Sequence, residues 1–222
     1  MVRIVADTST MYSTSQAREA GFTVAPLSVT IAGKSYREFD EISSEEFVGI
    51  IRQGHMPTSS QPAIGEVEDM YNQFPGEEII NVTMALGLSG TYTGAVAAAG
   101  LSENPERITV LNSRTLCGPH RYMVEKAVEL AKQGLSREEI VKRIEALMET
   151  AKSYLLPADF AYLRRGGRLS PLVSYVGKGW QVQISHAGAQ DKAELARNVL
   201  KEAMPEAEFR IYPLSPAFIT QG

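Results

Sequence analysis

The sequence has one cysteine, Cys117, and contains no long run of uncharged apolar residues. A single thiol can form no internal disulfide and cannot build a zinc site alone, which suits a reducing compartment. No apolar stretch approaches the roughly 18 residues that span a bilayer. The start, residues 1–7, is too short an apolar run for the core of a signal peptide. We therefore expect a cytoplasmic protein without a membrane span.

The sequence also lacks an excess of basic residues. Its 22 Lys and Arg stand against 26 Asp and Glu, for a formal net charge of −4. Nucleic-acid binding needs a basic footprint, so no nucleic-acid partner is expected. A phosphate-binding loop, a dinucleotide fingerprint and metal-ligand spacing of His, Cys or carboxylates are missing as well. We therefore predict no cofactor, no metal ion and no catalytic residue.

Short apolar runs alternate with helical periodicity, which indicates an α/β protein with a largely parallel sheet. Strands are expected over residues 2–6, 22–29, 79–84, 107–111, 182–185 and 209–212. Ser43 with Glu46, and Ser136 with Glu139, are capping boxes that start two of the intervening helices. We place a domain boundary near residue 153. Residues 1–153 then form an α/β domain, and residues 154–222 form a second α/β unit.

Two hydroxyl-rich segments fall where the pattern changes. Residues 57–62 (Pro-Thr-Ser-Ser-Gln-Pro) are expected at the start of a helix that begins near Pro62, where free N–H groups and the helix dipole favour an anion. Residues 88–91 (Leu-Ser-Gly-Thr) follow the central strand, at the edge where open α/β sheets usually bind ligands. There Gly90 would let the backbone approach a bound group, and Ser89 can donate a hydrogen bond. Helix capping alone is the alternative for both segments.

A basic turn follows in residues 164–170 (Arg-Arg-Gly-Gly-Arg-Leu-Ser). Its arginines could hold a phosphate or carboxylate bidentately or dock another protein, and a solvated turn is the alternative.

Ser89 is a weak candidate for a nucleophile. The serine elbow of α/β-hydrolases needs glycine two residues on each side, and here Thr91 takes the downstream place. None of His55, His120 and His186 lies in a hydrolase context. Asp7, after the first strand, is interpreted as a helix cap rather than a catalytic base.

Together these segments resemble the DegV family of bacterial fatty-acid-binding proteins. The matching segments occur in family order and cover roughly residues 1–177. They are residues 7–9 (Asp-Thr-Ser), 25–29 (Ala-Pro-Leu-Ser-Val), 58–62, 88–92 and 166–170. Each is weak alone, but the ordered set is specific.

The resemblance implies two α/β domains with a long-chain fatty acid in a tunnel between them, and no cofactor besides this ligand. It implies that the carboxylate binds Ser59 and Ser89. We expect the neighbouring residues Ser60 and Gly90 to belong to the same ligand-binding site. It also implies a separate ATP-dependent fatty acid kinase subunit as partner, which Arg168 faces.

Arg165 lies in the same basic turn and is expected to share that partner-facing role. The alternatives to a lipid carrier are a serine-dependent acyl hydrolase using Ser89 and a binding protein for another small acid.

The chain departs from the family pattern at three places. It is shorter, because the apolar run with Lys-Pro expected after residues 176–178 is missing and the second unit is incomplete. Gln221 stands where the family often has a histidine, and Asn112-Ser113 replaces a usual Asp-Ser pair. The first departure bears on the second wall of the tunnel, and the second bears on handover to a kinase.

Overall fold

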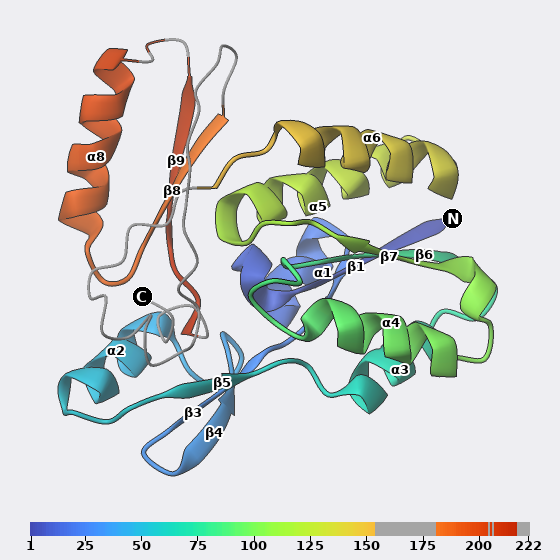
Figure 1. The fold of residues 1–222 in the computed structure, drawn as a ribbon, viewed down its shortest axis with the longest axis horizontal. Coiled ribbons are helices and arrows are strands. Elements are labelled where there is room, and N and C mark those ends of the chain that lie inside the picture. Colours follow the sequence, from blue (N-terminus) through green and yellow to red (C-terminus); the bar gives the residue numbers. More distant parts are fainter. Residues whose placement is uncertain (154–180, 204, 206, 217–222) are drawn as a thin grey trace.

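A parallel four-stranded sheet forms the centre of the protein (Figure 1). The computed structural model describes residues 1–153, 181–203, 205 and 207–216. The strand order is β2-β1-β6-β7, with all neighbours parallel. The bounds are β1 (Val2–Asp7), β2 (Thr23–Ala25), β6 (Glu78–Thr83) and β7 (Ile108–Asn112). The predicted α/β class with a largely parallel sheet is confirmed.

Helices cover both faces of this sheet (Figure 1). One face packs on α1 (Thr14–Ala20), α5 (Cys117–Lys132) and α6 (Arg137–Thr150), and the other on α3 (Ile64–Asn72) and α4 (Thr91–Leu101). Neighbouring side chains of a strand point to opposite faces, so Ile80 belongs to the first core and Ile79 to the second. This two-sided burial explains why the central strand is apolar throughout rather than alternating.

A small antiparallel sheet lies beside the parallel one, in the order β4-β3-β5. Its strands are β3 (Ser28–Ile31), β4 (Lys34–Arg37) and β5 (Thr58–Ser60), and α2 (Ser44–Arg52) lies between β4 and β5 in sequence. The predicted hairpin is confirmed, with Ala32 and Gly33 both at positive φ, as a tight two-residue turn requires.

Two predictions about this region are wrong. The single strand expected over residues 22–29 is two strands in different sheets, because Pro26 has no N–H to continue the ladder. Residues 58–60 form a strand rather than the start of a helix, because the edge of β3 supplies partners for their backbone. Helix α3 begins at Ile64, two residues after Pro62, which was expected at the first helical position, and Ala63 is its capping residue.

The capping boxes that start α2 and α6 are confirmed: the Ser43 side chain accepts from Glu46 N, and the Ser136 side chain accepts from Glu139 N. Two short 3-10 helices, η1 (Thr8–Thr10) and η2 (Pro105–Arg107), complete the connections.

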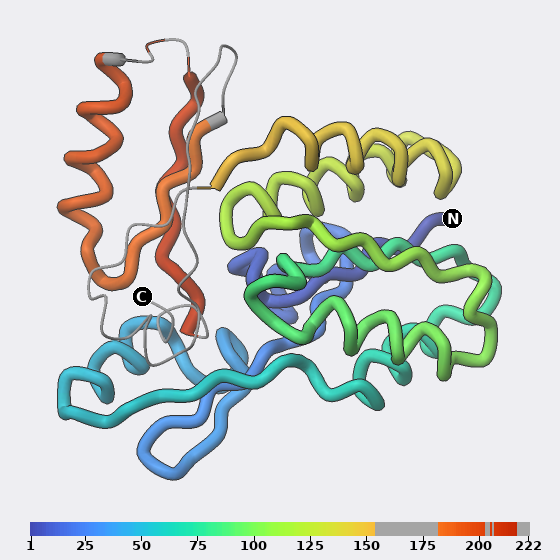
Figure 2. Tube along the Cα trace, viewed as in Figure 1, coloured from blue at the N-terminus to red at the C-terminus, as the bar shows by residue number. Residues whose placement is uncertain are grey.

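The last part of the chain is the predicted strand–helix–strand unit. It consists of β8 (Gln181–His186), α8 (Gln190–Ala203) and β9 (Glu208–Pro213), with β8 and β9 parallel. Figure 2 traces β9 down to the region of α2, where the Ser44 hydroxyl donates to the Leu214 carbonyl at 2.7 Å. On the other side, the Arg121 guanidinium lies between the rings of Tyr12 and Tyr212. The boundary near residue 153 adjoins residues that the structure does not describe, so it stays a prediction.

A third apolar cluster lies between the antiparallel sheet, α2 and the carboxyl ends of β1 and β6. Its buried members are Met11, Leu27, Val29, Ile31, Ile42, Phe47, Met84, Cys117 and Leu214. This cluster joins the end of β9 to the first part of the chain.

In the part of the chain that the structure describes, no helix is both long and apolar enough to cross a membrane.

Candidate functional site

The carboxyl ends of β1 and β6 meet at the point where the strand order of the parallel sheet reverses. The chain passes from β1 outward to β2 on one side and from β6 outward to β7 on the other. In open α/β sheets, ligands bind in the crevice outside such a switch point. The residues that follow β1 and β6 are therefore the first candidates for a site.

Asp7 ties these two strand ends together. Its carboxylate is buried, with 1% of the residue exposed. Its Oδ1 accepts from Ser9 N at 2.9 Å, which confirms the predicted capping role, and its Oδ2 accepts from Met84 N at 2.8 Å. The second bond fixes the start of the turn that leads from β6 to α4.

Ser89 lies at the end of that turn, two residues before the first residue of α4. Its Oγ accepts a hydrogen bond from Thr91 N at 3.2 Å and lies 2.8 Å from Thr91 Oγ1. Gly90 occupies the capping position of α4 and makes no side-chain cap. The first amides of α4 and the positive end of its dipole therefore accompany the Ser89 hydroxyl, and this combination favours an anion.

Ser59 lies on β5, paired with Val29 of β3, and is half-buried, whereas Ser60 is exposed. Among the described residues, the Ser59 hydroxyl has no hydrogen-bond partner, which leaves it able to donate to a ligand. The sequence placed Ser59 at a helix start, whereas the structure places it on β5, and α3 begins further along the chain at Ile64.

Gln61 brings the two hydroxyl-rich segments into contact. Its side chain lies in the space left by two glycines, the capping residue of α4 and a residue in the first turn of that helix. A Cβ atom built on Gly90 would lie 2.0 Å from Gln61 Oε1, and one built on Gly94 would lie 2.8 Å from Gln61 Nε2. Sequence reasoning did not single out Gln61. The only available signal was the pair of glycines four residues apart, one helical turn on a single face.

The apolar cluster described above lies beside both serines. Val29, the partner of Ser59 in the sheet, is a buried member of that cluster, and Leu88, next to Ser89, packs against it. Polar donors and a connected apolar core therefore adjoin each other at this edge.

The contacts of His120 with Ser9 and Asp7, behind the switch point, were not predicted from the sequence. His120 Nδ1 lies 2.5 Å from Ser9 Oγ and 4.0 Å from Asp7 Oδ1, while its Nε2 lies 2.8 Å from the Val82 carbonyl. The three side chains resemble a catalytic triad in composition only. All are almost fully buried, and both ring nitrogens are engaged, so no substrate can reach the serine.

Cys117 and Glu38 are buried in the same region. The Thr8 hydroxyl donates to the Glu38 carboxylate and accepts from Leu27 N. Burial, with Glu38 and Asp7 nearby, raises the pKa of the Cys117 thiol. The thiol is therefore protonated and unsuited to act as a nucleophile.

Two further predictions concern the basic turn with its partner-facing arginines and the absence of a metal site. The basic turn with Arg165 and Arg168, and Gln221, lie outside the described residues. Within the described ranges, no group of three His, Cys, Asp or Glu side chains could hold a metal ion.

The fold and site define a doubly wound α/β protein with a hydroxyl-rich, anion-favouring edge at its switch point. The profile of the family described as "Uncharacterised protein, DegV family" matches residues 1–183, and this chain belongs to that family. A DegV domain-containing protein of Staphylococcus aureus is 33% identical over 197 residues, which are 88% of this chain and 70% of that protein. Protein DegV of Bacillus subtilis is 32% identical over 181 residues, 79% of this chain and 64% of that one.

Solved structures share the fold. The crystal structure of DegV, a fatty acid binding protein from Bacillus subtilis, matches with a TM-score of 0.85 and 24% identity, covering 99% of this chain and 94% of that one. A DegV family protein from Eubacterium eligens loaded with heptadecanoic acid matches with a TM-score of 0.80 and 19% identity, covering 100% and 95%. The predicted family is confirmed, and structures of this fold carry bound fatty acids.

Proposed function

We propose that this chain binds a long-chain fatty acid, with the carboxylate at Ser59 and Ser89 and the acyl chain in the adjoining apolar cluster. The observation that carries the proposal is the contact of Gln61 with Gly90 and Gly94, which holds the two hydroxyl segments against each other. Ser60, exposed on the same strand, and Gly90 adjoin the proposed carboxylate position.

The acyl chain would supply most of the affinity. Burying about 14 methylenes at about 0.8 kcal/mol each gives on the order of 10 kcal/mol before ordering costs. The carboxylate must then be met by donors, because an isolated buried charge is very costly. Two hydroxyls and the first amides of α4 supply such donors without a lysine or arginine.

Neutral donors also suit a carrier that passes its ligand on. They leave a carboxylate oxygen accessible to a phosphoryl donor, which a bidentate arginine clamp would hinder. We therefore propose a non-catalytic role, in which a separate ATP-dependent kinase subunit forms the acyl phosphate. In this proposal Arg168 and Arg165 face that partner, and residues 154–222 complete the tunnel.

Purified protein is expected to carry fatty acid. Solvent extraction followed by mass spectrometry should release about one long-chain fatty acid per chain, and stripped protein should take up palmitate in a titration. A stripped protein that is folded by circular dichroism but takes up no long-chain acid contradicts the proposed function.

Alanine at Gly94 is expected to weaken fatty-acid binding without loss of stability. The new Cβ displaces the Gln61 side chain, and re-ordering one such side chain on binding costs about 0.5–1.5 kcal/mol. Helix α4 itself gains about 0.5–1 kcal/mol, since glycine is a poor helix former. Palmitate titration and urea unfolding measure the two effects.

Gly100→Ala is the matched control for this prediction. Gly100 lies in the same helix and a Cβ there meets nothing within 4 Å. It should gain helix stability and keep its affinity. Equal affinities of the two variants would show that the Gln61 contact does not shape the site.

A further inference from the structure

Asn81 is a polar residue in the middle of the central strand β6, with 3% of it exposed. Its Nδ2 donates to Tyr71 Oη at 2.6 Å. Within the described part of the chain, its Oδ1 has no hydrogen-bond partner. A buried carbonyl oxygen without a donor is costly, and ordered water commonly satisfies such groups.

Tyr71 determines which atom of the Asn81 amide is without a hydrogen-bond partner. Burial raises the pKa of Tyr71 to about 12, so its hydroxyl keeps the proton. That hydroxyl donates to the Ala95 carbonyl at 3.4 Å, and its oxygen therefore needs a donor. Asn81 must turn its NH2 group to Tyr71 and its oxygen away from it.

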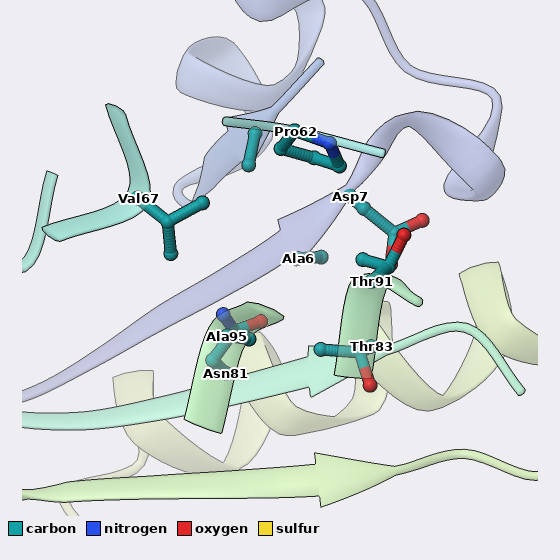
Figure 3. Close-up of a pocket in the computed structure, with 9 residues that line it drawn as sticks. Ala6, Asp7, Pro62, Val67, Asn81, Thr83, Thr91 and Ala95 are labelled. Atoms are coloured by element: carbon teal, nitrogen blue, oxygen red, sulfur yellow. The ribbon is translucent and has the colours of Figure 1, made fainter. Parts of the chain in front are cut away.

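A pocket lies beside Asn81, between β1, β6 and helices α3 and α4 (Figure 3). It is lined by Ala6, Asp7, Ala25, Pro62, Val67, Asn81, Thr83, Thr91 and Ala95. The pocket has room for about one ordered water molecule. Pro62 and Thr91 come from the two hydroxyl-rich segments, so the pocket adjoins the segments that carry Ser59 and Ser89.

The hydrogen bonds of the other polar groups in the pocket indicate which of them can share a water molecule with Asn81 Oδ1. Thr83 Oγ1 donates to the Leu111 carbonyl, and in Figure 3 its oxygen points away from Thr91. Both Asp7 oxygens already accept from a backbone amide. Thr91 Oγ1 is the remaining hydroxyl, and it is 2.8 Å from Ser89 Oγ.

We propose that a buried water molecule occupies this pocket and donates to Asn81 Oδ1 and Thr91 Oγ1, and that Thr91 Oγ1 in turn donates to Ser89 Oγ. In this arrangement Ser89 Oγ accepts from both the Thr91 amide and the Thr91 hydroxyl. The Ser89 proton is then directed to the fatty-acid carboxylate, which can only accept. Each bond in such a chain polarises the next. Asn81 and Thr91 are thus positioning residues, an inference that rests on the proposed function.

Asn81→Leu is expected to weaken palmitate binding roughly 3- to 10-fold, the scale of one net hydrogen bond. Without the water, Thr91 Oγ1 accepts the Ser89 proton and competes with the ligand. Binding of 1-hexadecanol should change little, because an alcohol can donate to Ser89 as well as accept from it.

A double-mutant cycle separates this role from general damage to the fold. Thr91→Val removes the competing acceptor, so adding Asn81→Leu should cause no further loss of palmitate affinity. Thr91→Ser keeps the hydroxyl and should bind as the parent protein does. Ser102→Ala is the control, because it removes a buried hydroxyl of the residue that follows α4, which donates to the Ala99 carbonyl.

Additive losses in the cycle, or equal losses for palmitate and hexadecanol, would overturn the relay. A crystal structure of the protein at high resolution tests the water directly, and a pocket without density between Asn81 and Thr91 also overturns it. A parent protein that binds no fatty acid contradicts the proposed function. In that case the electron density in the pocket still tests whether the water molecule is present.

Discussion

Asp7→Ala is expected to lower the free energy of unfolding by about 3–5 kcal/mol, because two buried amides lose a charged acceptor at once. The carboxylate accepts from Ser9 N and Met84 N, and neither amide has another route to water in the folded chain. The loss should appear as a lower urea midpoint with an unchanged m-value. It should also loosen the turn that carries Ser89.

Asp40→Ala is the matched control for this prediction. Asp40 also accepts from a backbone amide, Thr14 N at 3.0 Å, but it is exposed. Water can replace it there, so the loss should stay near or below about 1 kcal/mol. Similar losses for the two variants would mean that Asp7 is not the buried tie between β1 and β6.

Local sequence signals predicted the elements whose causes are local. The capping boxes at Ser43 and Ser136 and the hairpin turn at Gly33 depend on neighbours within four residues, and the structure has all of them. The central strand was predictable because both Ile79 and Ile80 are apolar, as burial on two faces requires.

Features that depend on distant partners could not be predicted in this way. Thr58–Ser60 is a strand only because β3 lies alongside it, and its own polar residues favour turns and caps. Pro26 is a local signal for the end of a strand. Nothing in the local sequence indicates that the chain then continues as β3 in a different sheet. Hydroxyls at a helix start and hydroxyls on a strand edge give the same local pattern.

In the candidate site, too, features with local causes were predictable and contacts between distant residues were not. Ser89 was placed correctly after the central strand, since that position follows from the order of the elements. The packing of Gln61 on Gly90 and Gly94 joins residues about 30 positions apart, and the Ser9–His120 bond spans 111 positions. Without an alignment, one sequence carries no signal for such pairs.

The largest expected effect on binding comes from removing both serine hydroxyls. Ser59→Ala or Ser89→Ala alone is expected to cost about 1–3 kcal/mol of palmitate affinity, because each leaves part of a buried carboxylate without a donor. At about 1.4 kcal/mol per factor of ten, a single change corresponds to roughly 5- to 150-fold weaker binding. Isothermal titration of stripped protein measures this directly.

The two losses report on one shared carboxylate, so they are not expected to add in full. Ser35→Ala is the control, since its hydroxyl bonds Thr30 at 2.6 Å within the same small sheet and belongs to no proposed contact. The acyl chain keeps its apolar surroundings in every variant, so hexadecanol should bind the double variant nearly as well as the parent. A double variant that holds palmitate at full strength removes the assignment of the carboxylate to these two hydroxyls.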